Sequence, residues 1–137
     1  MSNIETVKAI YEAFGKGDIP FILSQLADEV EWDSWTTENS AQHADVPWLR
    51  KQVGKDGVTE FFQIAATMGI YKFDILSYME GGNQVTSELY IGCKYFIDES
   101  LHLWTFNDEG KVTRFRHYVD TGQHIAGYHE VEKAVGV

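Results

Sequence analysis

The chain has 137 residues, of which 44% are hydrophobic and 14% aromatic, and this is enough to fill the core of one domain. Its 11 Lys and Arg residues against 21 Asp and Glu residues give a net charge of −10, which argues against binding to nucleic acids or to membrane surfaces. No apolar run reaches the roughly 18 residues of a membrane span, and the first residues, MSNIETVKAI, do not resemble a signal peptide. We therefore expect a single domain over residues 1–137 in a soluble, cytoplasmic protein.

Residues 7–35 predict two short helices that fold onto the start of a sheet. Gly17 and Asp18 separate the helices, because Gly commonly ends a helix and Asp commonly begins one. Side chains alternate in character from Val30 to Trp35, as they do in a strand. The apolar stripes of the two helices are Val7, Ile10, Tyr11 and Phe14, then Ile22, Leu23 and Leu26. Two helices packed on a sheet in this way frame a cavity.

Residues 36–53 lose all periodicity and are predicted to form a long loop. A loop of this length is uncommon in a compact domain unless it covers or builds a site, so it is a candidate lid that carries His43 and Trp48. A third helix is expected from about Lys55 to Met68, where Gly69 ends it.

The remaining sequence alternates like an antiparallel sheet, with a last short helix over residues 121–133. The expected strands cover residues 72–80, 83–97, 100–106 and 111–120, with turns at 81–83, 98–100 and 107–110. Hairpins that follow a layer of helices are typical of an α+β domain whose curved antiparallel sheet wraps the helices.

Alternation in the last hairpin predicts which side chains share a face. Without a bulge, Phe106 lies opposite Lys111 and His102 lies opposite Phe115. One face then carries His102, Trp104, Phe106, Thr113, Phe115, His117 and Val119, while Val112, Arg114 and Arg116 are among those on the other. The first face has the composition of a pocket wall, so Trp104, Phe106 and Phe115 are candidate ligand contacts together with Trp32 and Ser34 of the first strand.

His102 and His117 are the strongest catalytic candidates, because imidazole can give or take a proton near pH 7. The alternative is that both are hydrogen-bonded structural residues. We predict no metal site, since the two histidines are not expected to lie opposite one another and no third ligand has suitable spacing. No cofactor motif is present, and the single cysteine, Cys93, is expected to be a small buried residue.

The motifs AFGKGD, LADEVEW and NDEGKVTRFRHYVD, in this order of elements, resemble the SnoaL-like branch of the NTF2-like superfamily. The resemblance covers nearly the whole chain and implies a cone-shaped α+β fold, with a curved antiparallel sheet around about three N-terminal helices. The superfamily includes ketosteroid isomerases, epoxide hydrolases, polyketide cyclases, dehydratases and proteins that only bind ligands or dimerise, so the fold does not settle the function.

The resemblance does not extend to the best-understood catalytic sets. Where ketosteroid isomerases have an aspartate base, a tyrosine and an aspartic acid, this chain has Ser34, Ile10 and His102, with Asp33 and Tyr11 each one residue away. In the strand where limonene-type epoxide hydrolases carry an arginine and an aspartate, it has Leu89 and Ile91. Asp120 resembles the last aspartate of those hydrolases and the acid–base aspartate of polyketide cyclases, so it is a third catalytic candidate; otherwise it caps a helix.

Two hypotheses follow for the function. The first is a cofactor-independent isomerase, cyclase or dehydratase-type lyase, in which His102, His117 or Asp120 moves a proton on a small apolar or aromatic carbonyl compound. The second is a non-catalytic module that binds a ligand or dimerises. In either case a homodimer through the outer face of the sheet is expected, and Leu89, Ile91 and Cys93 would suit it if their face points outward.

Overall fold

The computed structural model describes residues 1–34 and 45–135. Residues 36–44 of the predicted lid, including His43, lie outside these residues. The helices are α1 (Asn3–Lys16), α2 (Ile19–Ser24), the 3-10 turn η1 (Pro47–Leu49), α4 (Gly54–Ala65) and α5 (Thr121–Val135). The strands are β1 (Leu26–Ser34), β2 (Gln52–Val53), β3 (Lys72–Gly81), β4 (Gln84–Gly92), β5 (Ile97–Phe106) and β6 (Val112–Tyr118).

The two N-terminal helices form as the sequence predicts. Ser2 and Glu5 make a reciprocal capping box at the start of α1, which satisfies two backbone N–H groups that the helix leaves unpaired. Gly17 ends α1 with a φ of 71°, a left-handed conformation that Gly adopts without a steric penalty. The Asp18 side chain accepts a hydrogen bond from the Phe21 N–H and so begins α2 directly.

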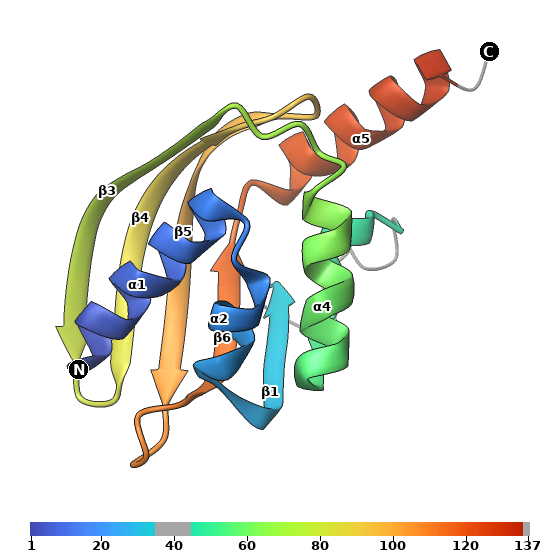
Figure 1. Ribbon diagram of the computed structural model, residues 1–137. Helices are drawn as coiled ribbons and strands as arrows, with labels where there is room; N and C mark the ends of the chain where they lie inside the picture. Colours follow the sequence, from blue (N-terminus) through green and yellow to red (C-terminus); the bar gives the residue numbers. More distant parts are fainter. Residues whose placement is uncertain (35–44, 136–137) are drawn as a thin grey trace.

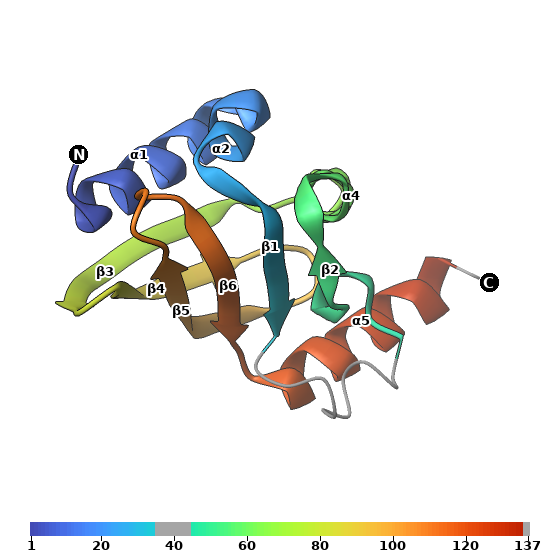
Figure 2. The same ribbon diagram turned by 90° about the horizontal axis from the view of Figure 1, so that it is seen from below.

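The six strands form one curved, open sheet in the order β2-β1-β6-β5-β4-β3. Helices α1, α2 and α4 lie on one side of it, and α5 continues from β6 beyond the end of the sheet (Figures 1 and 2). All neighbouring strands are antiparallel except β1 and β6, which run parallel, so the prediction of a wholly antiparallel sheet is wrong at this one pair. The α+β class, with helices wrapped by a curved sheet, is confirmed.

The turn between β4 and β5 lies earlier than the sequence predicts. β4 ends at Gly92, and the Cys93 N–H donates a hydrogen bond to the Phe96 carbonyl at 2.9 Å, which closes a tight turn. Residues 98–100, predicted to be the turn, instead begin β5. Asp98 and Ser100 are consequently buried on the inner face of the sheet, where they take part in the polar network described below.

The hairpin of β5 and β6 contains a bulge that shifts its register. Thr105 pairs with Arg114 but Phe106 pairs with Val112, so Thr113 has no partner of its own on β5. Val112 therefore enters the core in the place predicted for Thr113. The shift also pairs His102 with His117, which corrects the expectation that the two histidines are not opposite one another.

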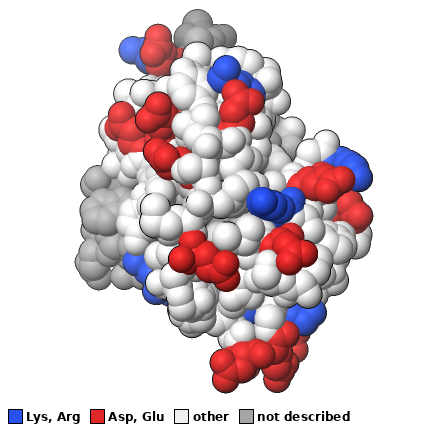
Figure 3. Space-filling model, turned by 90° about the vertical axis from the view of Figure 1, so that its left-hand side faces the viewer, with Lys and Arg blue, Asp and Glu red and all other residues white. Residues whose placement is uncertain are grey.

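The face of β4 that carries Leu89, Ile91 and Cys93 points inward. Leu89 is fully buried, Cys93 is nearly so, and Ile91 lines the internal cavity. These residues are therefore unsuited to the sheet-to-sheet contact that the sequence suggested. On the side of the molecule where β3 forms the sheet edge, carboxylates are spread across the surface, and several of them lie beside basic groups (Figure 3). No helix in the described part of the chain combines the length and apolarity that a membrane span needs.

Gly127 allows α5 to approach the β4–β5 turn closely. A Cβ at this position would collide with the backbone carbonyl of Tyr95. Two hydrogen bonds also join α5 to this turn and to the start of β5. The Ile97 N–H donates to the Gln123 amide oxygen at 3.0 Å, and the Tyr95 hydroxyl donates to Glu132 at 3.1 Å.

We predict that Gly127→Ala destabilises the protein by about 1–3 kcal/mol, because the added methyl group has to push α5 away from Tyr95. At a helix position without such a contact, replacing Gly by Ala stabilises the folded protein by up to about 1 kcal/mol. The matched control is Gly122→Ala in the same helix, where the nearest atom is the Asp120 carboxylate at 3.5 Å. Equal unfolding free energies of the two variants in urea would contradict the prediction.

Candidate functional site

A cavity of about 90 Å³ lies between the inner face of the sheet and helices α1 and α4. Aromatic and aliphatic side chains make up almost all of its wall, and its few polar groups come from Tyr11, Ser100, the indole nitrogens of its tryptophans and three histidines, His102, His117 and His124. A mostly apolar cavity with a few converging polar groups is the usual composition of a small-molecule site.

Five of the eight site residues predicted from the sequence line this cavity: Trp32, His102, Trp104, Phe115 and His117. They come from three adjacent strands, β1, β6 and β5. Trp32 stacks on Phe115 with ring centroids 4.1 Å apart, and Trp104 packs against Phe115 at 4.5 Å. The predicted pocket wall therefore exists, although the register that forms it differs from the one predicted.

The other three predicted residues lie outside the cavity lining. Ser34 donates a hydrogen bond from its hydroxyl to the Leu49 carbonyl at 3.0 Å, which ties β1 to η1. Phe106 is 1% exposed within the core. Asp120 precedes α5, where its carboxylate accepts a hydrogen bond from the Gln123 N–H at 3.1 Å, so the structure gives it the helix-capping position.

Tyr11 of α1 brings a hydroxyl group into the cavity beside His102. Its oxygen lies 2.7 Å from His102 Nδ1 and 2.5 Å from the Ser87 hydroxyl, and it accepts a hydrogen bond from the Trp104 indole at 3.1 Å. The family resemblance placed Ile10 at the tyrosine position of ketosteroid isomerases, with Tyr11 next to it, and in this structure it is the Tyr11 hydroxyl that lies beside His102. The amphipathic stripe of α1 contained both residues, so the sequence did not distinguish them.

The Ser87–Tyr11–His102 chain satisfies its hydrogen bonds in either of two directions. In one, Ser87 donates to Tyr11 and Tyr11 donates to His102 Nδ1, so the imidazole proton is on Nε2. In the other, His102 Nδ1 donates to Tyr11 and Tyr11 donates to Ser87, so Nε2 has a free lone pair. Reversing the chain therefore changes His102 Nε2 from a donor to an acceptor without creating a charge.

Burial keeps this group of residues uncharged. It lowers the pKa of His117 to about 3 and, with a smaller contribution from His117, lowers the pKa of His102 well below 6.5. It also raises the pKa of Tyr11 well above 10, against the opposing effect of its hydrogen bonds with Ser87 and Trp104. At neutral pH the cavity thus offers neutral donors and acceptors rather than ions.

Two buried nitrogen atoms of the cavity wall have no hydrogen-bond partner among the described residues. They are Nε1 of Trp32 and Nε2 of His117, in side chains that are 2% and 6% exposed. An unpaired buried polar group typically costs about 1–3 kcal/mol, so such atoms are uncommon in native interiors.

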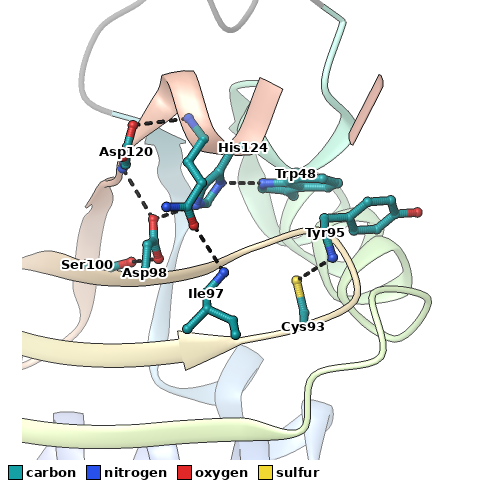
Figure 4. A network of polar contacts seen from close by, with 9 residues as sticks. Trp48, Cys93, Tyr95, Ile97, Asp98, Ser100, Asp120 and His124 are labelled. Atoms are coloured by element: carbon teal, nitrogen blue, oxygen red, sulfur yellow. Dashed lines mark hydrogen bonds and ion pairs between the residues drawn. The ribbon is translucent and has the colours of Figure 1, made fainter. Parts of the chain in front are cut away.

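A second polar network closes the end of the cavity near α5 (Figure 4). The Trp48 indole donates to His124 Nδ1 at 2.8 Å, and His124 Nε2 lies 2.7 Å from an oxygen of Asp98. Because an indole N–H can only donate, Nδ1 must accept and Nε2 carries the proton toward Asp98. The Ser100 hydroxyl donates to the other Asp98 oxygen at 3.2 Å.

This network joins η1, β5 and α5. Of its members, only Trp48 was expected from the sequence to lie near the site. His124 lies in the last helix and Asp98 in a segment predicted to be a turn, so neither appeared on a strand face. Both ring nitrogens of His124 are engaged, which makes the network structural in this conformation.

Asp33 lies on the opposite face of β1, as alternation predicts. It is 2% exposed and accepts a hydrogen bond from Arg116 Nε at 3.1 Å. It therefore does not take the place of the catalytic base in a ketosteroid isomerase. Within residues 1–34 and 45–135, no group of three His, Cys, Asp or Glu side chains is arranged to hold a metal ion.

The comparison with protein families settles the assignment of this fold, since the model of the SnoaL-like domain matches residues 7–120. The chain belongs to the SnoaL-like family. Among proteins with curated functions, none matches the sequence.

The fold of this SnoaL-like chain is similar to that of several solved structures. One is an NTF2-like protein of unknown function from Burkholderia pseudomallei, with 23% identity, 92% of this chain and 97% of that chain covered, and a TM-score of 0.75. TerC, crystallised with polyporic acid, is 25% identical, with 93% and 95% covered and a TM-score of 0.71. A protein from Rhodopseudomonas palustris that carries the provisional name of isomerase is 18% identical, with 100% and 98% covered and a TM-score of 0.69.

The neutral state of His117 predicts how stability depends on pH. Its pKa is about 6.5 in the unfolded chain and about 3 in the fold, so the unfolded chain binds more protons between these values. Protonation of His117 in the unfolded chain therefore does not reduce the unfolding free energy above pH 6.5, and it reduces this free energy progressively as the pH falls toward 3. Between pH 7 and pH 5 this amounts to about 2 kcal/mol.

We expect His117→Leu to reduce the loss of unfolding free energy between pH 7 and pH 5 by that amount. Replacing the exposed His129 by Asn is the control and should leave the pH dependence as in the wild type. Urea titrations at the two pH values measure both effects. A wild-type slope in His117→Leu would show that this histidine is not held neutral by burial.

For the second network, we predict that His124→Phe lowers the unfolding free energy by about 3 kcal/mol, because it leaves the buried Trp48 N–H without an acceptor and removes the imidazole donor from the buried Asp98 carboxylate. Ser100→Ala removes one hydrogen bond from the same carboxylate and should cost only about 1 kcal/mol. Thermal or chemical unfolding compares the two, and similar losses would argue against the network.

Proposed function

We propose that this SnoaL-like protein binds a small aromatic or apolar carbonyl compound and moves a proton on it without a cofactor. The observation that carries the proposal is His102, buried in an aromatic cavity and held through Nδ1 by a tyrosine hydroxyl 2.7 Å away. The aromatic wall suits a flat, apolar molecule. One structural relative has the provisional name of isomerase and another was crystallised with polyporic acid, and both are consistent with this class of chemistry.

His102 Nε2 is the atom that exchanges the proton in this proposal. Among the described residues its hydrogen-bond partner is Tyr11, which engages Nδ1 and leaves Nε2 for a bound molecule. With a lone pair on Nε2, the imidazole takes a proton from the carbon next to a carbonyl group, and with a proton on Nε2 it returns one. The Ser87–Tyr11 pair sets which form is present, so Tyr11 is a positioning residue.

A neutral imidazole of low basicity is suited to this role only in a dry cavity. Water would solvate an ionised intermediate, whereas the aromatic wall excludes water and strengthens each hydrogen bond to the developing enolate oxygen. Burial lowers the pKa of His102 well below 6.5, so the imidazole is unprotonated at neutral pH.

We expect the wild-type protein to accelerate exchange of the C2 protons of 1-indanone for deuterium in D2O, measured by ¹H NMR. His102→Gln should lose most of this acceleration, on the order of 10²-fold, which is a typical contribution of general acid–base catalysis. Tyr11→Phe should also slow it, since it removes the hydroxyl that orients the ring. The rate should not titrate with a histidine pKa between pH 6.5 and pH 8, because burial lowers the pKa of His102 well below 6.5 and that of His117 to about 3.

The control is Phe106→Leu, which alters a buried ring outside the cavity and should retain the exchange rate. If the ketone binds but its exchange is not accelerated, the second hypothesis, a non-catalytic binding module, replaces the first. Asp120 as the acid–base group stays a prediction from the family resemblance, and its replacement by Asn in the same assay tests it.

Homodimerisation through the outer face of the sheet also stays a prediction. That face presents Leu101 and Met79, which are 38% and 72% exposed, beside the outward-pointing Arg114 and Arg116 of β6. The carboxylates of Glu88 and Glu99 lie on the outer sides of β4 and β5, so a second sheet packed across this face has complementary charges available.

A further inference from the structure

The unpaired nitrogens of Trp32 and His117 mark a specific place in the cavity wall. Both side chains are more than nine-tenths buried, and neither nitrogen has a partner among the described residues. Trp32 Nε1 can only donate a hydrogen bond, whereas neutral His117 Nε2 donates when it carries the ring proton. The rest of the wall is apolar there, so nothing in it compensates for the loss of water around these atoms.

The two side chains are close neighbours in space. Their strands are adjacent, with Trp32 paired to Phe115 and Ser34 paired to His117. Both rings also pack against the same two phenylalanines. Phe115 lies 4.1 Å from Trp32 and 5.8 Å from His117 between ring centroids, and Phe61 lies 5.7 Å and 6.1 Å from them.

We infer that Trp32 Nε1 and His117 Nε2 together receive one carbonyl oxygen of the ligand, so that the preferred ligand is a flat ketone or quinone-type compound rather than a plain hydrocarbon. This inference rests on the proposed function, since it assigns the ligand class of the same cavity. A carbonyl oxygen has two lone pairs and accepts two donors in its plane. Binding then removes the penalty of both unpaired nitrogens, and this favours the carbonyl compound over an isosteric hydrocarbon.

Phe61 of α4 is the side chain that has to yield when the oxygen enters. It contacts both Trp32 and His117 and is only partly buried, so it can turn away from them at lower cost than the fully buried strand residues. Burial also keeps His117 neutral, with a pKa of about 3, so it contributes a neutral N–H rather than a cation. An oxygen held in this way does not require a negative charge.

The test compares 1-indanone with indane, which has the same ring system without the carbonyl group. Their dissociation constants are measured by NMR titration for the wild type, Trp32→Phe and His117→Leu. We expect the ratio of the two constants, indane over 1-indanone, to fall about tenfold in each variant, because each removes one donor while the apolar wall remains.

Trp48→Phe is the matched control. It makes the same chemical change at another indole that lines the cavity, but this indole already donates to His124, so the ratio should stay within about twofold of the wild type. The apoproteins give a second readout, independent of any ligand. Trp48→Phe leaves His124 Nδ1 unpaired and should therefore be less stable than Trp32→Phe, in which no hydrogen bond is lost.

Each outcome decides the question. A lowered ratio in Trp32→Phe and His117→Leu but not in Trp48→Phe supports the inference. An unchanged ratio in both, with both compounds still bound, overturns the carbonyl-binding role of this pair and leaves the proposed function standing. If neither compound binds the wild type, the inference fails together with the proposal that this cavity takes small aromatic ligands.

Discussion

The bulge at Thr113 sets the register of the β5–β6 hairpin, and the chemistry of the cavity depends on that register. It pairs Trp104 with Phe115 and His102 with His117, so aromatic rings and imidazoles gather on one inner surface. β1 then adds Trp32 to the same surface through its parallel pairing with β6. Without the bulge, the hairpin would pair His102 with Phe115, and Thr113 rather than Val112 would face the core.

This surface combines strong burial with polar groups that carry no charge. An ionised side chain in such a place would need a partner of opposite charge, whereas neutral imidazole, phenol and indole groups need only hydrogen bonds. Tyr11 supplies these bonds for His102, Ser87 and Trp104. In the described part of the chain, Trp32 Nε1 and His117 Nε2 have no such hydrogen bonds. The polar groups around Tyr11 are therefore already paired, whereas these two nitrogens are the ones that we propose a ligand pairs.

The closing network of Trp48, His124 and Asp98 serves a different purpose. It fixes η1 and α5 to the start of β5, with both ring nitrogens of His124 in use (Figure 4). Gly127 makes the arrangement possible, because only a residue without a Cβ lets α5 approach the Tyr95 carbonyl this closely. The three histidines of the cavity thus differ in role. His124 is structural, whereas His102 is oriented by Tyr11 and His117 has an unpaired Nε2 among the described residues.

The sequence by itself determined the element order, the α+β class and the aromatic composition of the inner strand face. Local signals fix these, because Gly17 and Asp18 act on adjacent residues and alternation places Trp32, His102 and Trp104 on one side of their strands. Only the tertiary structure decided the partners: the bulge at Thr113, the parallel pairing of β1 with β6, and the approach of Tyr11 and His124 from helices far along the chain. The physical reason is that hydrogen bonds between distant segments depend on register and on how helices dock, and neither leaves a periodic trace in the residues concerned.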